Sequence, residues 1–131
     1  MEFNILGNNG HLSAEFDHKW REEEQILTFF ITIEVGQQNI WFAAELFRRD
    51  LLIFRRDLQS LYANPTGSLD FVFRGQSLTI NAVRNSLGHI HWNVGVELKG
   101  EVYLSMKFSL RADQTYLPPL IHQINFILES T

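Results

Sequence analysis

The stretch FRRDLLIFRRDLQSLY, residues 47–62, contains the unit FRRDL twice, at Phe47–Leu51 and Phe54–Leu58. Seven residues are close to two turns of about 3.6 residues each, so the repeat predicts an α-helix. Its apolar residues recur at helical spacing and form one stripe, which comprises Phe47, Leu51, Phe54, Leu58, Leu61 and Tyr62. Asn64 and Pro65 then predict the end of the helix, with Asn64 in the left-handed conformation.

The polar positions of this helix carry four arginines and two aspartates: Arg48, Arg49, Asp50, Arg55, Arg56 and Asp57. No aspartate stands three or four residues from an arginine, so the spacing predicts no charge pairing within the helix. Arginines can hold phosphates, but the two aspartates and the net charge of -4 favour a solvated face or pairing with the glutamates of residues 22–24. Leu52 and Ile53 lie off the stripe, and with Arg49 and Arg56 they form a predicted secondary contact surface.

Apolar and polar residues alternate in eight further segments, which predicts half-buried β-strands. The segments are residues 1–5, 12–20, 26–35, 40–46, 69–73, 78–82, 90–98 and 102–110. Short connections rich in Gly and Asn separate them, so neighbouring strands should pair antiparallel. Phe30 is an apolar exception on the polar side of its strand.

A second helix is predicted at the C-terminal end, where Leu117, Leu120, Ile121, Ile124, Ile127 and Leu128 share one face. Pro118 and Pro119 are harmless only in a first turn, so the regular helix should start between Thr115 and Pro118. Asp113 should then cap a preliminary turn. The predicted fold is one α+β domain over residues 1–131, with about eight mostly antiparallel strands in two four-stranded meanders and two helices, one mid-chain and one C-terminal.

Composition narrows the classes of function. The chain has 131 residues, a formal charge of -4 and no cysteine, which disfavours a general nucleic-acid binder and excludes disulfides and cysteine-based zinc sites. The first residues do not resemble a signal peptide, and no apolar run approaches about 18 residues. We therefore expect a cytoplasmic protein with no direct contact to nucleic acid or membrane.

Few residues form a pattern that would support catalysis or metal binding. His89 and His91 share a strand face at a spacing that metals can use, but no third ligand stands at a suitable spacing, so an exposed pair is favoured. Five carboxylates on strands could act as acid and base, but their period favours a solvated sheet surface: Glu15, Asp17, Glu34, Glu45 and Glu97. No nucleophile elbow, P-loop or dinucleotide motif is present, so we predict no catalytic residues, no metal, no cofactor and no enzyme.

The densest acidic patch comprises Glu15, Asp17, Glu22, Glu23 and Glu24. It is either a solubilising loop or the predicted contact surface for a basic protein, since opposite charge speeds encounter and suppresses wrong partners.

Three segments together resemble the small WapI-type immunity proteins of bacterial toxin systems. They are the opening MEFNILGNNGHL, the strand-to-helix segment FAAEL at 42–46 with GSL at 67–69, and the closing FSLRADQTYL at 108–117. Pro118 and Pro119 depart from the family pattern. The resemblance implies a cytoplasmic protein that binds and neutralises the toxic domain of a cognate toxin, often a nuclease, and that is no enzyme.

Two alternatives remain open on the residues alone. Eight strands rich in Phe and Trp could enclose a pocket for a small apolar ligand, which a large internal cavity would favour and a filled core would oppose. Self-association through Leu52, Ile53 and Phe30 would make a homodimer.

Overall fold

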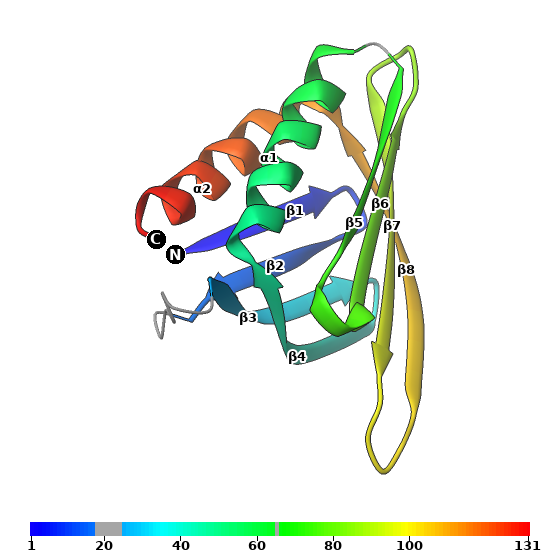
Figure 1. Cartoon of the computed structure of the whole chain (residues 1–131). Coiled ribbons are helices and arrows are strands. Elements are labelled where there is room, and N and C mark those ends of the chain that lie inside the picture. The colour runs from blue at the N-terminus through cyan, green and yellow to red at the C-terminus, as the bar shows by residue number, and fades with distance from the viewer. Residues whose placement is uncertain (18–24, 65) are drawn as a thin grey trace.

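The computed structural model describes residues 1–17, 25–64 and 66–131 of the chain. Its elements follow in the order β1 (Glu2–Gly7), β2 (Gly10–Phe16), β3 (Ile26–Val35), β4 (Gln38–Phe47), α1 (Arg48–Ala63), β5 (Gly67–Val72), a 3₁₀ turn η1 (Arg74–Gln76), β6 (Leu78–Arg84), β7 (His89–Leu98), β8 (Leu104–Asp113), a second 3₁₀ turn η2 (Gln114–Tyr116) and α2 (Leu117–Glu129) (Figure 1). This order confirms the predicted α+β class with a mid-chain and a C-terminal helix.

The strands form two antiparallel meanders, sheet A in the order β1-β2-β3-β4 and sheet B in the order β5-β6-β7-β8. The period-two pattern buries one face of each sheet. In β3, for example, Phe29, Ile31 and Ile33 are fully buried, whereas Phe30 is 51% exposed. The predicted antiparallel pairing is therefore confirmed, and so are the predicted inward faces, except for the exposed Val102 and Leu104.

The helix α1 lies between the two sheets and contacts both. Its buried side chains are Leu51, Phe54, Leu58 and Leu61. The Phe54 ring stacks on Phe71 of sheet B with centroids 4.2 Å apart and lies 6.2 Å from the Phe3 ring of sheet A. Inward side chains of both sheets and both helices consequently belong to one hydrophobic cluster, and Figure 1 shows the two helices side by side against the sheets.

Both ends of α1 differ in detail from the prediction. Phe47 precedes the helix as its N-cap, and its backbone N–H donates to the Asp50 carboxylate at 3.3 Å, which is one half of a capping box. Tyr62 was expected in the apolar stripe, but it is 47% exposed, and its neighbour Leu61 is the residue of the last turn that is buried in the core. Asn64 is extended, with φ -99° and ψ 132°, not left-handed, since a following proline disfavours helical conformations.

The start of α2 agrees with the prediction. Asp113 caps η2 through a hydrogen bond from the Thr115 backbone N–H at 2.9 Å, and α2 begins at Leu117 with proline in its first turn. Buried α2 residues are Leu117, Leu120, Ile124, Ile127 and Leu128.

Most predicted strands differ from the observed strands by a few residues at an end, and two of these differences involve residues that were predicted to face inward. The segment 102–110 begins only at Leu104, because β7 and β8 part after the pair Leu98–Leu104. Their hairpin extends beyond the other strands (Figure 1), so Val102 lies outside the hydrophobic core and is 80% exposed. In the predicted strand 12–20, β2 ends at Phe16, and His18 and Trp20 lie outside the described residues.

The β1–β2 turn attaches sheet A to the edge of sheet B. The Asn8 backbone N–H donates to the Arg111 carbonyl at 2.7 Å. The Asn9 side chain donates to the Ser109 carbonyl at 2.7 Å and accepts from the Arg111 N–H at 3.1 Å. Gly10 is required behind this turn, because a Cβ there would lie 2.1 Å from the Glu34 carbonyl oxygen.

Candidate functional site

The outward side chains of sheet A form a regular grid, because antiparallel pairing aligns them across the strands. One row comprises Glu2, Glu15, Phe30 and Ala43, and the next comprises Asn4, Ser13, Thr32 and Trp41. We call these outward side chains, with those of the flanking rows, the acidic sheet face. It combines the features expected of a protein-binding surface, namely charge of one sign and exposed aromatic rings.

Every strand of sheet A contributes a glutamate to the acidic sheet face: Glu2, Glu15, Glu34 and Glu45. None of the four strands contains a lysine or arginine. The His11 imidazole also lies on this face, and its Nε2 is 3.8 Å from a Glu34 carboxylate oxygen. The face therefore has a negative potential that suits a cationic partner.

The predicted acidic patch is only partly described. Glu15 is exposed on β2, and the partly buried Asp17 follows that strand with its backbone N–H bonded to the Thr28 carbonyl at 2.8 Å. Both thus belong to sheet A and its continuation. Glu22, Glu23 and Glu24 lie outside the described residues.

Phe30 and Trp41 form an exposed aromatic pair on this face, which was not predicted from the sequence. Phe30 is 51% exposed and Trp41 is 79% exposed, and a shallow groove of about 250 Å³ runs between them. Phe30 is an apolar residue on the otherwise polar side of β3. Trp41 lies on the same outward side of the next strand, β4. The register, which brings Ala43 opposite Phe30 and Trp41 opposite Thr32, was the missing information.

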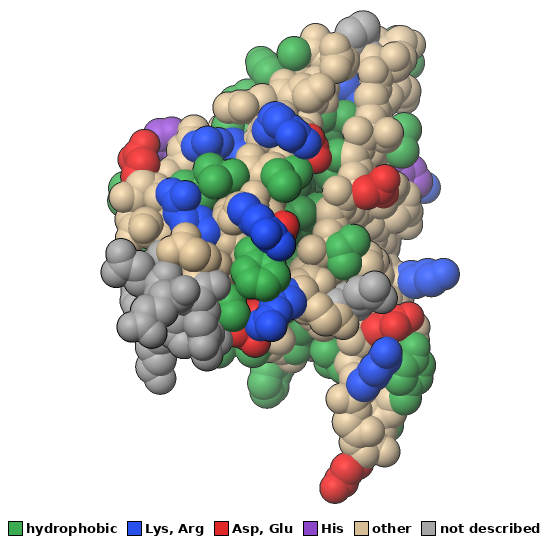
Figure 2. Space-filling model, viewed as in Figure 1, with side chains coloured by type: hydrophobic (Ala, Val, Ile, Leu, Met, Phe, Trp, Pro, Cys, Tyr) green, Lys and Arg blue, Asp and Glu red, His purple; other side chains and the backbone are tan. Residues whose placement is uncertain are grey.

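The predicted secondary contact surface lies on α1. Arg49, Leu52, Ile53 and Arg56 are spaced by three or four residues, so they share one helix face. Arg49 and Arg56 are exposed, Ile53 is 42% exposed, and Leu52 is half-buried against the core. Figure 2 shows basic and hydrophobic side chains alternating along this side of the molecule. Phe54 points from α1 toward the inner face of sheet A, so this surface and Phe30 lie on opposite sides of that sheet.

Arg56 is paired within α1, contrary to the prediction that this helix does not pair its own arginines, whereas Arg48 and Arg55 bond groups at the C-terminal end of the chain. Arg56 bonds the adjacent Asp57 carboxylate at 3.2 Å, a contact between sequence neighbours that the helical spacing rule does not consider.

Arg48 donates to the Leu128 carbonyl at 3.1 Å and to the Thr131 hydroxyl at 2.8 Å. Arg55 donates to the Asn125 side chain at 3.0 Å. Arg48 and Arg55 thus hold α2 against α1, which accounts for them without a phosphate.

The histidine pair lies on the outer face of sheet B. His89 and His91 are both exposed, opposite Asp113 and Arg111 of β8. Within residues 1–17, 25–64 and 66–131, no three His, Cys, Asp or Glu side chains come together as a metal site.

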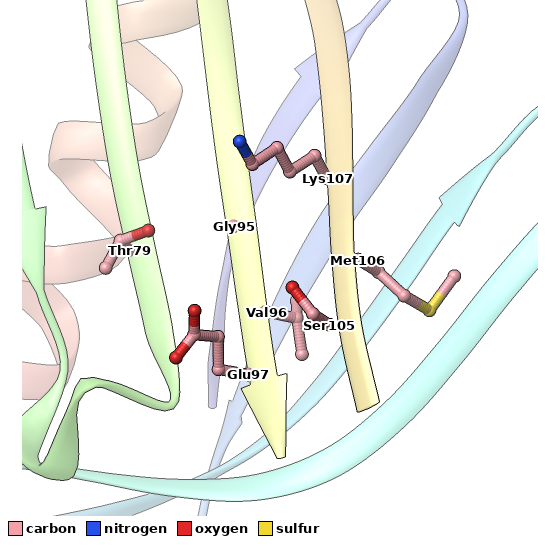
Figure 3. A pocket seen from close by; sticks show the side chains of 7 residues that line it. All are labelled: Thr79, Gly95, Val96, Glu97, Ser105, Met106 and Lys107. Atoms are coloured by element: carbon pink, nitrogen blue, oxygen red, sulfur yellow. The ribbon is translucent and has the colours of Figure 1, made fainter. Parts of the chain in front are cut away.

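The rest of this outer face is mostly polar, apart from the exposed Val72 and Val83, and it carries charges of both signs. A side-chain ladder crosses its four strands, with Asn81 donating to Asp70 at 2.7 Å, Asn93 to Asn81 at 3.4 Å and Ser109 to Asn93 at 3.3 Å. Beside the ladder, Gly95 forms the floor of a depression of about 160 Å³ flanked by Thr79, Glu97 and Lys107 (Figure 3). Glu97 therefore belongs to a different sheet from the other four strand carboxylates, so the five cannot form one acid–base site.

The interior is occupied by aromatic side chains. Phe3, Phe29, Phe54, Phe71 and Phe73 pack ring to ring between the sheets, with centroids 4.2 to 6.3 Å apart. These rings fill the space where the sheets would have to enclose an apolar ligand.

Across the described parts of the chain, neither helix has the length and apolar character needed to cross a bilayer. A search of curated proteins found no match. A family model described as the immunity protein WapI-like family matches residues 1–131.

Proposed function

The chain belongs to the WapI-like immunity protein family, and we propose that it binds and neutralises the toxic domain of a cognate bacterial toxin in the cytoplasm. The family match over residues 1–131 is the observation that carries this proposal. The protein would act by protein–protein contact and would perform no chemistry of its own.

We further propose that the toxic domain is a nuclease. An enzyme that holds RNA or DNA presents basic side chains to the phosphates. A chain with a net charge of -4 and a glutamate on every strand of sheet A is suited to cover such a surface.

The contact surface is proposed to include Glu15 and Asp17, together with Glu22, Glu23 and Glu24. The surface of Arg49, Leu52, Ile53 and Arg56 on α1 is proposed as a second contact region, because its arginines and the exposed Ile53 could meet an acidic part of the same partner. An apolar-ligand module is not proposed, since Phe54 and Phe71 stack at 4.2 Å in the middle of the interior.

Co-expression tests this function. The toxic domain encoded beside this gene is induced alone, with this chain, or with an unrelated acidic protein of similar size. We expect cells to survive only with this chain, and the two purified proteins to form a stable complex. Cell death despite soluble expression of this chain, with no complex on gel filtration, would contradict the proposal.

A further inference from the structure

Two large aromatic side chains are exposed on the outer face of sheet A, where a partner protein could bury them. Phe30 and Trp41 are 51% and 79% exposed, although each belongs to a regular ten-residue strand. Phe30 lies on the inner strand β3 and Trp41 on the edge strand β4, and the continuous pairing of these two strands fixes both backbones before any partner arrives. Trp is among the residues that contribute most to binding when it enters a partner's pocket, and a rigid backbone lowers the entropy lost on binding.

The charges around these rings specify the chemistry of the partner. Glu15 is in the same row as Phe30, and Glu34 is in the row beside Trp41. A nucleic acid would be repelled by these carboxylates. A second copy joined through the same face would bring two acidic sets together, which is also unfavourable. A protein surface rich in Lys and Arg fits the face.

The tip of the β7–β8 hairpin is the main competing surface. Val102 and Tyr103 are 80% and 59% exposed there, but their neighbours Lys99 and Glu101 have opposite charges. The residues between Leu98 and Leu104 are also outside the strand pairing. This tip therefore specifies no partner charge and lacks the backbone order of sheet A.

We propose that the outer face of sheet A is the docking surface for a basic protein surface, with Trp41 and Phe30 as anchors that enter an apolar recess of the partner. Glu15 and Glu34 orient the encounter and accelerate it. This inference rests on the proposed function, and its partner is the toxic domain of that proposal.

The anchors are tested by binding of an inactive form of the toxic domain encoded beside the gene, measured by calorimetry. Trp41→Ser and Phe30→Ser are each expected to weaken binding at least about 30-fold, the range of interface hot spots. The matched controls Val102→Ser and Tyr103→Ser also remove exposed apolar side chains and should change the affinity by less than about threefold. Melting temperature and the near-ultraviolet signal of buried Trp92 confirm that each variant is folded.

The charges are tested separately by association kinetics. Glu15→Gln with Glu34→Gln should slow association about tenfold at low salt and flatten its salt dependence, because two steering charges are lost. The control pair Glu97→Gln with Glu101→Gln changes the net charge by the same amount outside sheet A and should leave the rate nearly unchanged.

A third measurement follows Trp41 directly in a Trp20→Phe background. Its fluorescence should shift to the blue when the toxic domain binds, since its exposed ring becomes buried, whereas Trp92 is already 2% exposed. Wild-type affinity in the aromatic variants with loss in the hairpin variants would overturn the docking surface and leave the proposed function intact. A wild-type chain that neither binds nor rescues would overturn both.

Discussion

Asp113 is the last residue of β8, and its carboxylate caps the 3₁₀ turn that leads into α2. It accepts a hydrogen bond from the Thr115 backbone N–H at 2.9 Å. That bond first, and then the Thr115 side chain, keeps the pKa of Asp113 below its ordinary value of 3.8, with smaller contributions from His89 and Arg84. The ionised form is therefore the one that folding favours.

The first prediction concerns the pH dependence of this cap. A depressed pKa stabilises the fold above the unfolded-state value and ceases to do so as the pH falls through the lower folded-state value. Asp113→Asn keeps an acceptor oxygen but has no charge, so its urea midpoint should lie below that of the wild type at pH 7. The difference should shrink below pH 3.8. A difference that stays constant from pH 7 to pH 3 would contradict the role of the charge.

At the scale of elements, the β1–β2 turn acts as a connector between the sheets. The edge strand β8 would otherwise leave backbone groups without partners beside the turn. Asn8 and Asn9 supply three hydrogen bonds to Ser109 and Arg111, two of them through the Asn9 side chain. The NNG segment therefore joins residues about a hundred positions apart.

A second prediction separates the two asparagines. Asn9→Ala removes both side-chain hydrogen bonds and should lower the free energy of unfolding by about 1–2 kcal/mol. Asn8→Ala is the matched control, because the contact of Asn8 to Arg111 uses its backbone N–H. Urea denaturation of both variants measures the difference, and equal losses would exclude the Asn9 side chain as the connector.

The whole molecule is organised around aromatic contacts that join both sheets to α1. Phe54 stacks on Phe71 and also approaches Phe3, so neither sheet has a core of its own. The acidic sheet face and the arginine-rich face of α1 point to opposite sides of this core. We expect the two sheets to unfold together as a single domain.

A third prediction tests this cooperativity with Phe54→Ala. Removal of a fully buried phenylalanine should cost about 3–5 kcal/mol. If both sheets share the core, native-state hydrogen exchange should show the same decrease in the free energy of opening for the amides of β3 and of β7. Should this variant fail to fold, Phe54→Leu provides a milder test of the same equality.

Phe126→Ala is the control for this experiment. Phe126 is 57% exposed on α2, so its loss should hardly change exchange in either sheet. A loss confined to β7 in the Phe54 variant would indicate that the sheets unfold independently.

The elements and their buried faces were predictable from the sequence by itself, because periods of two and 3.6 residues are local properties of the backbone. These periods identified the eight strands and the helix of the FRRDL repeat, and the position of Asp113 ahead of two prolines identified the cap. The candidate site was predictable only in part: Glu15 and Asp17 were named, but Trp41 was not.

Only the tertiary structure decided which outward side chains become neighbours. Strand register placed Trp41 near Phe30, and the division into two sheets separated Glu97 from the other carboxylates. The packing of α1 on α2 brought Arg48 to the Leu128 carbonyl. These relations depend on contacts between distant residues, such as Asn9 with Ser109 and Asn4 with Gln123. No local pattern encodes such contacts, because they form only when the shared core brings both sheets and both helices together.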